Sequence, residues 1–182
     1  CIIKELSDTS YKEFDNALRR MFVLLITMAE DCKTSISKKK FDVLKNMENM
    51  DYNFNRFNDF ALRLLNKAGY EKFNKTPSMY TFIFLLEMIA DEYKKLAFHI
   101  NEYKTIGKEI IPIFDIQHHQ LKRVYDMFYK FDKEKCRNVF EEDYVGDVIN
   151  KKVYLRLSNK DQELLHHLKK IGIYSLSLAE LI

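Results

Sequence analysis

Apolar side chains recur every three or four positions along most of this 182-residue chain, which is the spacing of one face of an α-helix. The first such segment begins at Ser10, which can cap a helix and has Glu13 three residues later, and it ends near Lys38. Its apolar stripe consists of Phe14, Leu18, Met21, Phe22, Leu25, Ile26 and Ala29. The pattern predicts a long amphipathic helix over this segment.

Two further segments of the first half carry the same pattern. One covers about 41–66 and closes at Gly69, a residue typical of helix C-termini. The next opens at Thr76 and Pro77, which suit the first turn of a helix, and continues to about residue 100. The positions expected to face inward on the 41–66 helix are Phe41, Leu44, Met47, Phe54, Phe57, Phe60, Ala61 and Leu64.

The second half of the chain repeats this layout, with helical patterns at about 109–131, 133–157 and 159–182. The end of the chain, 167–182, is also a weakened copy of 85–100. The shared apolar positions are Leu86, Ile89, Leu96, Ala97 and Ile100 in the first copy and Leu168, Ile171, Leu178, Ala179 and Ile182 in the second. These positions follow a helical period, which indicates that one helix face has been duplicated.

The repeat predicts an all-α fold of six long antiparallel helices, arranged as two tandem three-helix bundles. We place the first bundle at 10–102 and the second at 103–182, and we assign 1–9 to a linker from a part of the protein that precedes the sequence. Only 4 Gly and 2 Pro are present, too few to punctuate a multi-stranded sheet.

Composition narrows the class of protein. With 47% hydrophobic and 31% charged residues the chain is globular, and a net charge of +3 does not by itself indicate nucleic acid or lipid as a partner. The 3 cysteines lack metal-type spacing, which favours free thiols and a cytoplasmic location. No apolar run approaches the ~20 residues of a membrane span, so we expect no membrane insertion. Since there is no phosphate loop or nucleophile turn, we expect no enzymatic activity.

The segment Leu86-Glu87-Met88-Ile89-Ala90-Asp91 resembles the Leu-Glu-Arg-Ile-(Ala/Gly)-Asp segment that the PhoU family of helical phosphate-signalling regulators repeats on the third helix of each half. Residues 14–22 and 63–70 resemble the archaeal branch, in which the helical part often follows an AbrB-type DNA-binding domain. The resemblance implies a phosphate-responsive regulator that contacts DNA only through such an N-terminal domain.

In that family the Glu-x-x-x-Asp motif is associated with metal clusters, and Glu87 and Asp91 match it. Asp51 on the second helix is the expected further ligand. The motif is lost in the second half, where Lys169 and Ile173 replace the two acids. The resemblance therefore implies a divalent or iron- or zinc-type metal ion on the first half alone. The alternative is a solvated acidic surface paired with Lys94, Lys95 or Arg63.

A second constellation does not depend on the family. Asp115 and His118, like Glu163 and His166, form acid-x-x-His motifs on the first and third helices of the second half. Two such motifs supply half of a di-metal carboxylate site, and their histidines could instead hold zinc. The alternative is that these are capping and surface side chains.

We expect a non-enzymatic regulatory or interaction domain whose helical faces contact a protein partner or a second copy of the chain. A helical-bundle metalloprotein of the di-metal type and a helical scaffold without any ligand remain the alternatives.

Overall fold

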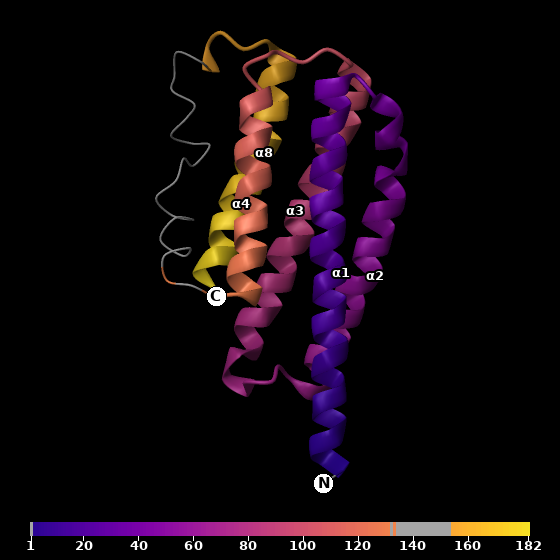
Figure 1. The fold of residues 1–182 in the computed structure, drawn as a ribbon, viewed down its shortest axis with the longest axis vertical. Helices are drawn as coiled ribbons and strands as arrows, with labels where there is room; N and C mark the ends of the chain where they lie inside the picture. Colours follow the sequence, from indigo (N-terminus) through magenta and orange to yellow (C-terminus); the bar gives the residue numbers. More distant parts are fainter. Residues whose placement is uncertain (1, 132, 134–153) are drawn as a thin grey trace.

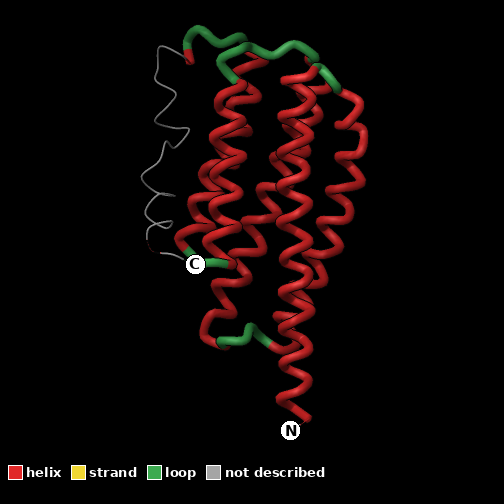
Figure 2. Tube along the Cα trace, in the orientation of Figure 1, coloured by secondary structure: helices red, strands yellow, loops and turns green. Residues whose placement is uncertain are grey.

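The computed structural model describes residues 2–131, 133 and 154–182. Within these ranges the chain is all-α, without strands (Figures 1 and 2). The described part contains five packed helices: α1 (Ile2–Lys38), α2 (Met47–Ala68), α3 (Thr76–Tyr103), α4 (Ile111–Tyr129) and α8 (Asn159–Glu180). Two short 3-10 helices, η1 (Phe41–Asn46) and η2 (Phe73–Lys75), precede α2 and α3. The prediction of an all-α fold is confirmed.

Local chemistry explains where most of these helices begin and end. α1 stops at Lys38 because Lys39 adopts a left-handed conformation (φ 53°), and α2 stops at Gly69 (φ 71°), a conformation that glycine adopts without strain. Pro77 lies in the first turn of α3. α1 begins at Ile2 rather than at the predicted cap Ser10, since 2–9 contain neither glycine nor proline to interrupt the helix.

Four of the helices form a closed ring. α1 packs against α3 and α4, and α8 also packs against α3 and α4, so each member touches two others. α2 lies outside the ring against α1 and α3 (Figure 1). The helices α1 and α3 therefore belong to two units. They are members of the ring, and together with α2 they form a three-helix unit.

The predicted arrangement as two tandem bundles of three helices each is therefore wrong. One continuous apolar core runs through all five described helices, and it joins side chains of both halves. The physical reason is the width of the apolar surface on α3, where Phe82, Ile83, Leu86, Ile89, Ala90, Tyr93, Leu96, Ala97 and Ile100 are all buried. A surface of that width contacts neighbours on several sides.

The predicted helix at 133–157 falls mostly outside the described residues.

The two segments of the predicted repeat are neighbours in the ring. The two copies are on α3 and α8, which pack side by side, and the shared apolar positions are buried in both copies except for half-buried Ile182. The contact of α1 with α3 in the first half corresponds to that of α4 with α8 in the second. The ring therefore consists of two helix pairs, α1 with α3 and α4 with α8, each with one segment of the predicted repeat.

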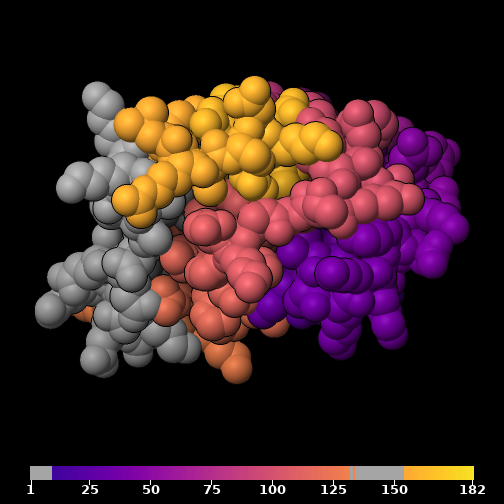
Figure 3. Space-filling model, turned by 90° about the horizontal axis from the view of Figure 1, so that it is seen from above, coloured from indigo at the N-terminus to yellow at the C-terminus, as the bar shows by residue number. Residues whose placement is uncertain are grey.

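A loop at 104–110 connects the halves and crosses one end of the bundle between the purple first-half helices and the yellow α8 (Figure 3). Its Gly107 N–H donates to Asp161 Oδ1 over 2.8 Å. Asp161 belongs to the cap of α8, where its own N–H donates to Ser158 Oγ over 3.2 Å and its Oδ2 accepts from that hydroxyl. The loop is thus fixed to the start of α8.

None of the helices within the described ranges combines the length and apolar character that crossing a bilayer requires.

Candidate functional site

The predicted acidic residues of the first half lie along the interface of α2 and α3. Lys94 Nζ donates to Asp51 Oδ2 over 2.7 Å, and Asn58 Nδ2 donates to Glu87 Oε2 over 3.0 Å. The two helices are antiparallel, and the two contacts are seven residues apart on each, so they lie on matching faces. Asp91 is on the same face of α3, between Glu87 and Lys94. We call these five residues the acidic ladder.

The acidic ladder contains buried oxygen atoms without partners. Asp51 is 5% exposed and Asn58 is 3% exposed. The Oδ1 atom of each is enclosed and has no hydrogen-bond partner among the described residues. An unsatisfied buried acceptor costs about 1–3 kcal/mol. These two oxygens therefore favour the arrival of a donor or a cation.

Lys94 neutralises one end of the acidic ladder. Its hydrogen bond to Asp51, together with the negative charges of Asp51, Asp91 and Glu48, raises the pKa of Lys94. The ammonium therefore stays charged and occupies one oxygen of Asp51. A metal ion that approached this carboxylate would compete with Lys94.

The structure brings the predicted ligands together only in part. Glu87 and Asp91 share a face, whereas Asp51 lies at the level of Lys94. No three His, Cys, Asp or Glu side chains within the described ranges converge as a metal centre. On the second half, Ile173 is 48% exposed and the Lys169 ammonium lies 5.6 Å from the Tyr154 ring centroid.

The two acid-x-x-His motifs have different neighbours. Asp115 pairs with Lys33, and His118 Nε2 lies 3.6 Å from Glu30 Oε1, so this motif faces α1. Glu163 accepts a hydrogen bond from the Tyr103 hydroxyl, so it faces α3. His166 is exposed. The structure does not bring these four side chains together.

Sequence reasoning missed Glu92, which is the most buried charged group among the described residues. Its side chain is 1% exposed, and its Oε2 lies 2.6 Å from Nδ1 of His167 on α8. Its Oε1 is 3.2 Å from Lys95 Nζ and 3.4 Å from Lys170 Nζ. The signal was present, because Glu92 interrupts the apolar stripe between Ile89 and Leu96. The acid-x-x-His pattern had instead selected the neighbouring His166.

The groups around Glu92 shift one another's protonation. Burial would raise the pKa of Glu92, but the hydrogen bonds with His167 and Lys95 outweigh it, so the pKa is lowered. Burial lowers the pKa of His167 and outweighs the opposing effect of Glu92. The His99 ring stacks on His167 with centroids 5.3 Å apart and adds to that lowering. His167 is therefore held neutral, with Nδ1–H donating to the carboxylate.

Comparisons with protein-family models, with curated proteins and with solved structures found no match to the chain.

Proposed function

We propose that this chain is a non-catalytic regulatory domain of the PhoU-like, phosphate-responsive kind, and that its acidic ladder takes up a divalent cation. The observation that carries the proposal is a buried oxygen without a partner at each end of the acidic ladder: Asp51 Oδ1 at the end where Asp91 and Lys94 lie, and Asn58 Oδ1 beside Glu87. The duplicated helix pairs of the ring also support this class, since the family's fold is itself a duplication.

The donor atoms favour a particular kind of ion. Carboxylate and amide oxygens suit hard cations such as Mg²⁺ or Mn²⁺, which complete their coordination with water. Asp51 and Asp91 offer carboxylate oxygens from both helices at the Lys94 end of the acidic ladder. Asn58 and Glu87 do so two helical turns away, so each end is a separate position for an ion. A cation there would link α2 to α3 more firmly than the single ion pair of Asp51 with Lys94.

Lys94 gives the proposed site a built-in competitor. An incoming cation displaces the ammonium from Asp51, and the released side chain changes the charge that the α2–α3 surface presents to a partner. The ammonium thus sets the cation concentration at which the domain responds. Regulation follows from this exchange without any chemical step. The alternative of a di-metal enzyme gains no support, because Asp115 and His118 face α1 whereas Glu163 faces α3.

The test is titration of the metal-free protein with Mn²⁺, followed by the loss of the free-ion electron paramagnetic resonance signal. We expect Glu87→Ala/Asp91→Ala to abolish uptake. Lys94→Met should tighten it by about tenfold, because it removes the competing charge at a fully retained set of ligands. The matched control is Asp59→Ala/Glu71→Ala, which removes two exposed carboxylates of the same region.

The outcomes are distinct. If neither the wild type nor Lys94→Met takes up Mn²⁺, the cation proposal is wrong, and the chain acts as a scaffold through its helical faces. If the control loses uptake as fully as Glu87→Ala/Asp91→Ala, the ion responds only to overall charge, and the assignment to the acidic ladder fails.

A further inference from the structure

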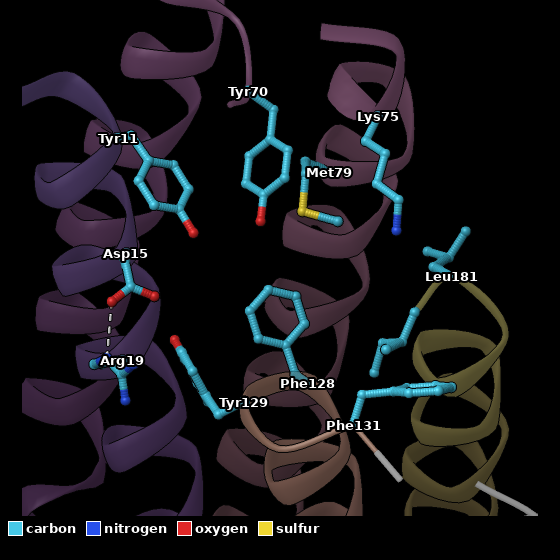
Figure 4. A pocket seen from close by; sticks show the side chains of 11 residues that line it. Tyr11, Asp15, Arg19, Tyr70, Lys75, Met79, Phe128, Tyr129, Phe131 and Leu181 are labelled. Carbon is cyan, nitrogen blue, oxygen red and sulfur yellow. Dashed lines mark hydrogen bonds and ion pairs between the residues drawn. The ribbon is translucent and has the colours of Figure 1, made fainter. Parts of the chain in front are cut away.

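A second candidate site lies at the end of the bundle opposite the 104–110 loop. It is a cleft of about 460 Å³, a size suited to a small molecule. Its walls come from the first half of α1, the loop after α2, the start of α3, and the ends of α4 and α8 (Figure 4). We call it the end cleft. None of its lining residues belongs to the acidic ladder.

Arg19 is held in place at one side of the end cleft. Its Nε donates to Asp15 Oδ2 over 2.9 Å, and its guanidinium carbon lies 3.8 Å from the centroid of the Tyr129 ring. The ion pair and the stacking fix the plane of the guanidinium. Its terminal NH₂ groups have no partner among the described residues, so they remain free to bind a planar oxyanion.

Three tyrosine hydroxyls add further donors. Those of Tyr11, Tyr70 and Tyr129 point into the same space beside Asp15 (Figure 4). Burial raises the pKa of Tyr70 and of Tyr129, so both phenols stay protonated. Asp15 adds to the raised pKa of Tyr129 through its negative charge and through hydrogen bonding, although no described acceptor lies in full hydrogen-bond geometry with the Tyr129 hydroxyl. It is a buried donor that a ligand could satisfy.

Lys75 determines the sign of the net charge in the end cleft. Its ammonium reaches into the end cleft from the end of η2, just before α3 (Figure 4), and no described residue forms an ion pair with it. Asp15 and Arg19 neutralise each other. The described side chains that line the end cleft therefore carry a net positive charge, and their hydrogen-bond donors outnumber their acceptors. Both properties match a ligand with a carboxylate or phosphate group.

Aromatic side chains of the end cleft indicate which group the ligand carries besides its anionic group. Phe128 and Tyr129 form part of the wall, and Phe131 stands at its edge with 60% of its surface exposed. Ring faces in such positions stack with another planar ring. We propose that the end cleft binds a small aromatic anion, a planar ring carrying a carboxylate or a phosphate, with the anionic group at Arg19 and the tyrosine hydroxyls and the ring along Phe128 toward Phe131. Lys75, on the opposite side of the end cleft, adds positive charge without touching the anionic group (Figure 4).

The test is isothermal titration calorimetry with phenyl phosphate and with benzoate, in buffer containing EDTA so that the acidic ladder plays no part. We expect both probes to bind. Inorganic phosphate should bind at least about tenfold more weakly, because it lacks the ring. Benzyltrimethylammonium, which keeps the ring and reverses the charge, should not bind.

Variants locate the site. Arg19→Gln should weaken phenyl phosphate by about tenfold, the usual size of a charge-assisted hydrogen bond. Lys75→Gln, which removes a more distant positive charge, should weaken it several-fold. Tyr129→Phe should weaken it several-fold. The matched controls are Arg20→Gln and Lys72→Gln, exposed cations outside the lining. Circular dichroism checks that every variant folds.

The proposal is overturned if phenyl phosphate and benzoate do not bind, or if inorganic phosphate binds as tightly as phenyl phosphate. It is also overturned if benzyltrimethylammonium binds, or if the control variants lose as much affinity as Arg19→Gln and Lys75→Gln. Because the assay contains no free metal, none of these results depends on the cation proposal.

Discussion

Glu92 of α3 and His167 of α8 form a hydrogen bond of 2.6 Å, with 1% and 9% of their side chains exposed. The two residues are 75 positions apart in the sequence, and they join the duplicated helices through a polar contact inside an otherwise apolar interface. Breaking a buried pair costs more than an exposed one, because the remaining group stays desolvated. This contact therefore fixes the register of α3 against α8.

Acid should destabilise the protein through this pair. The pKa of His167 is lowered in the folded state, so the unfolded chain binds a proton near pH 6.5 that the folded chain does not. The stability is present above that pH and is lost as the pH falls below it. Burial lowers the pKa of His118 as well, so it contributes in the same direction. We expect the melting temperature to fall between pH 7 and pH 5.

Variants test the origin of that slope. His167→Gln should lower stability at pH 7 by about 1–2 kcal/mol and flatten the pH dependence. His166→Gln, which changes an exposed ring next to it, should leave both unchanged. Thermal melts over the pH range provide the measurement. A slope that survives in His167→Gln/His118→Gln would show that other groups cause it.

Gly107→Ala should destabilise the protein by about 1–2 kcal/mol. A Cβ at this position would lie 2.7 Å from Asp161 Oδ2, which is too close for two unbonded atoms. Relief of the clash would break the hydrogen bond from Gly107 N–H to Asp161. Urea unfolding of Gly107→Ala, Asp161→Ala and the double variant measures this. The double variant should cost clearly less than the sum, and full additivity would contradict the contact.

The shared core can be tested at Ile89 and Ile171, equivalent positions of the repeat that are fully buried. Each substitution by alanine should cost about 2–5 kcal/mol in a single cooperative transition. Hydrogen exchange distinguishes one core from two. Ile171→Ala should weaken protection in α2, which does not pack against α8, because α2 depends on the shared helices α1 and α3. Unchanged protection in α2 would indicate that the halves unfold independently.

Cys32 should react with iodoacetamide only after unfolding. Its side chain is fully buried, its Sγ is 4.0 Å from the Tyr93 carbonyl oxygen, and burial raises the pKa of the thiol. The reactive thiolate is therefore scarce and enclosed. Peptide mass spectrometry should find Cys32 unmodified in the native protein and fully alkylated in urea. Equal rates in the two conditions would exclude the enclosed thiol.

Local sequence patterns predicted well where the helices lie, but they predicted less well which helices pack against one another. Gly69 and Pro77 punctuate the chain as expected, and the apolar stripes are largely buried. Phe60 was expected to face inward, but it is 39% exposed because α2 lies outside the ring and is covered only by α1 and α3. Periodicity gives the direction of a side chain, but it does not show how many helices surround the element.

The residues of the candidate sites were likewise predictable only where a pattern lies on a single helix. Glu87 and Asp91 could be found from a motif on one helix, whereas their partners Asn58 and Lys94 depend on the register between α2 and α3. His166 and His167 are adjacent in sequence but about 100° apart around α8, so the motif selected the exposed ring. The end cleft combines five separate segments, and no local pattern in the sequence indicates it.

The sharing of α1 and α3 has a consequence for the integrity of the chain. A protease cut within 104–110 would leave two fragments, each with an open apolar side that only the other fragment covers. The nicked protein would therefore elute as a single particle in gel filtration, and the separated fragments would aggregate until they were mixed again. We therefore expect the two halves to behave as complementary fragments, each of which folds only in the presence of the other.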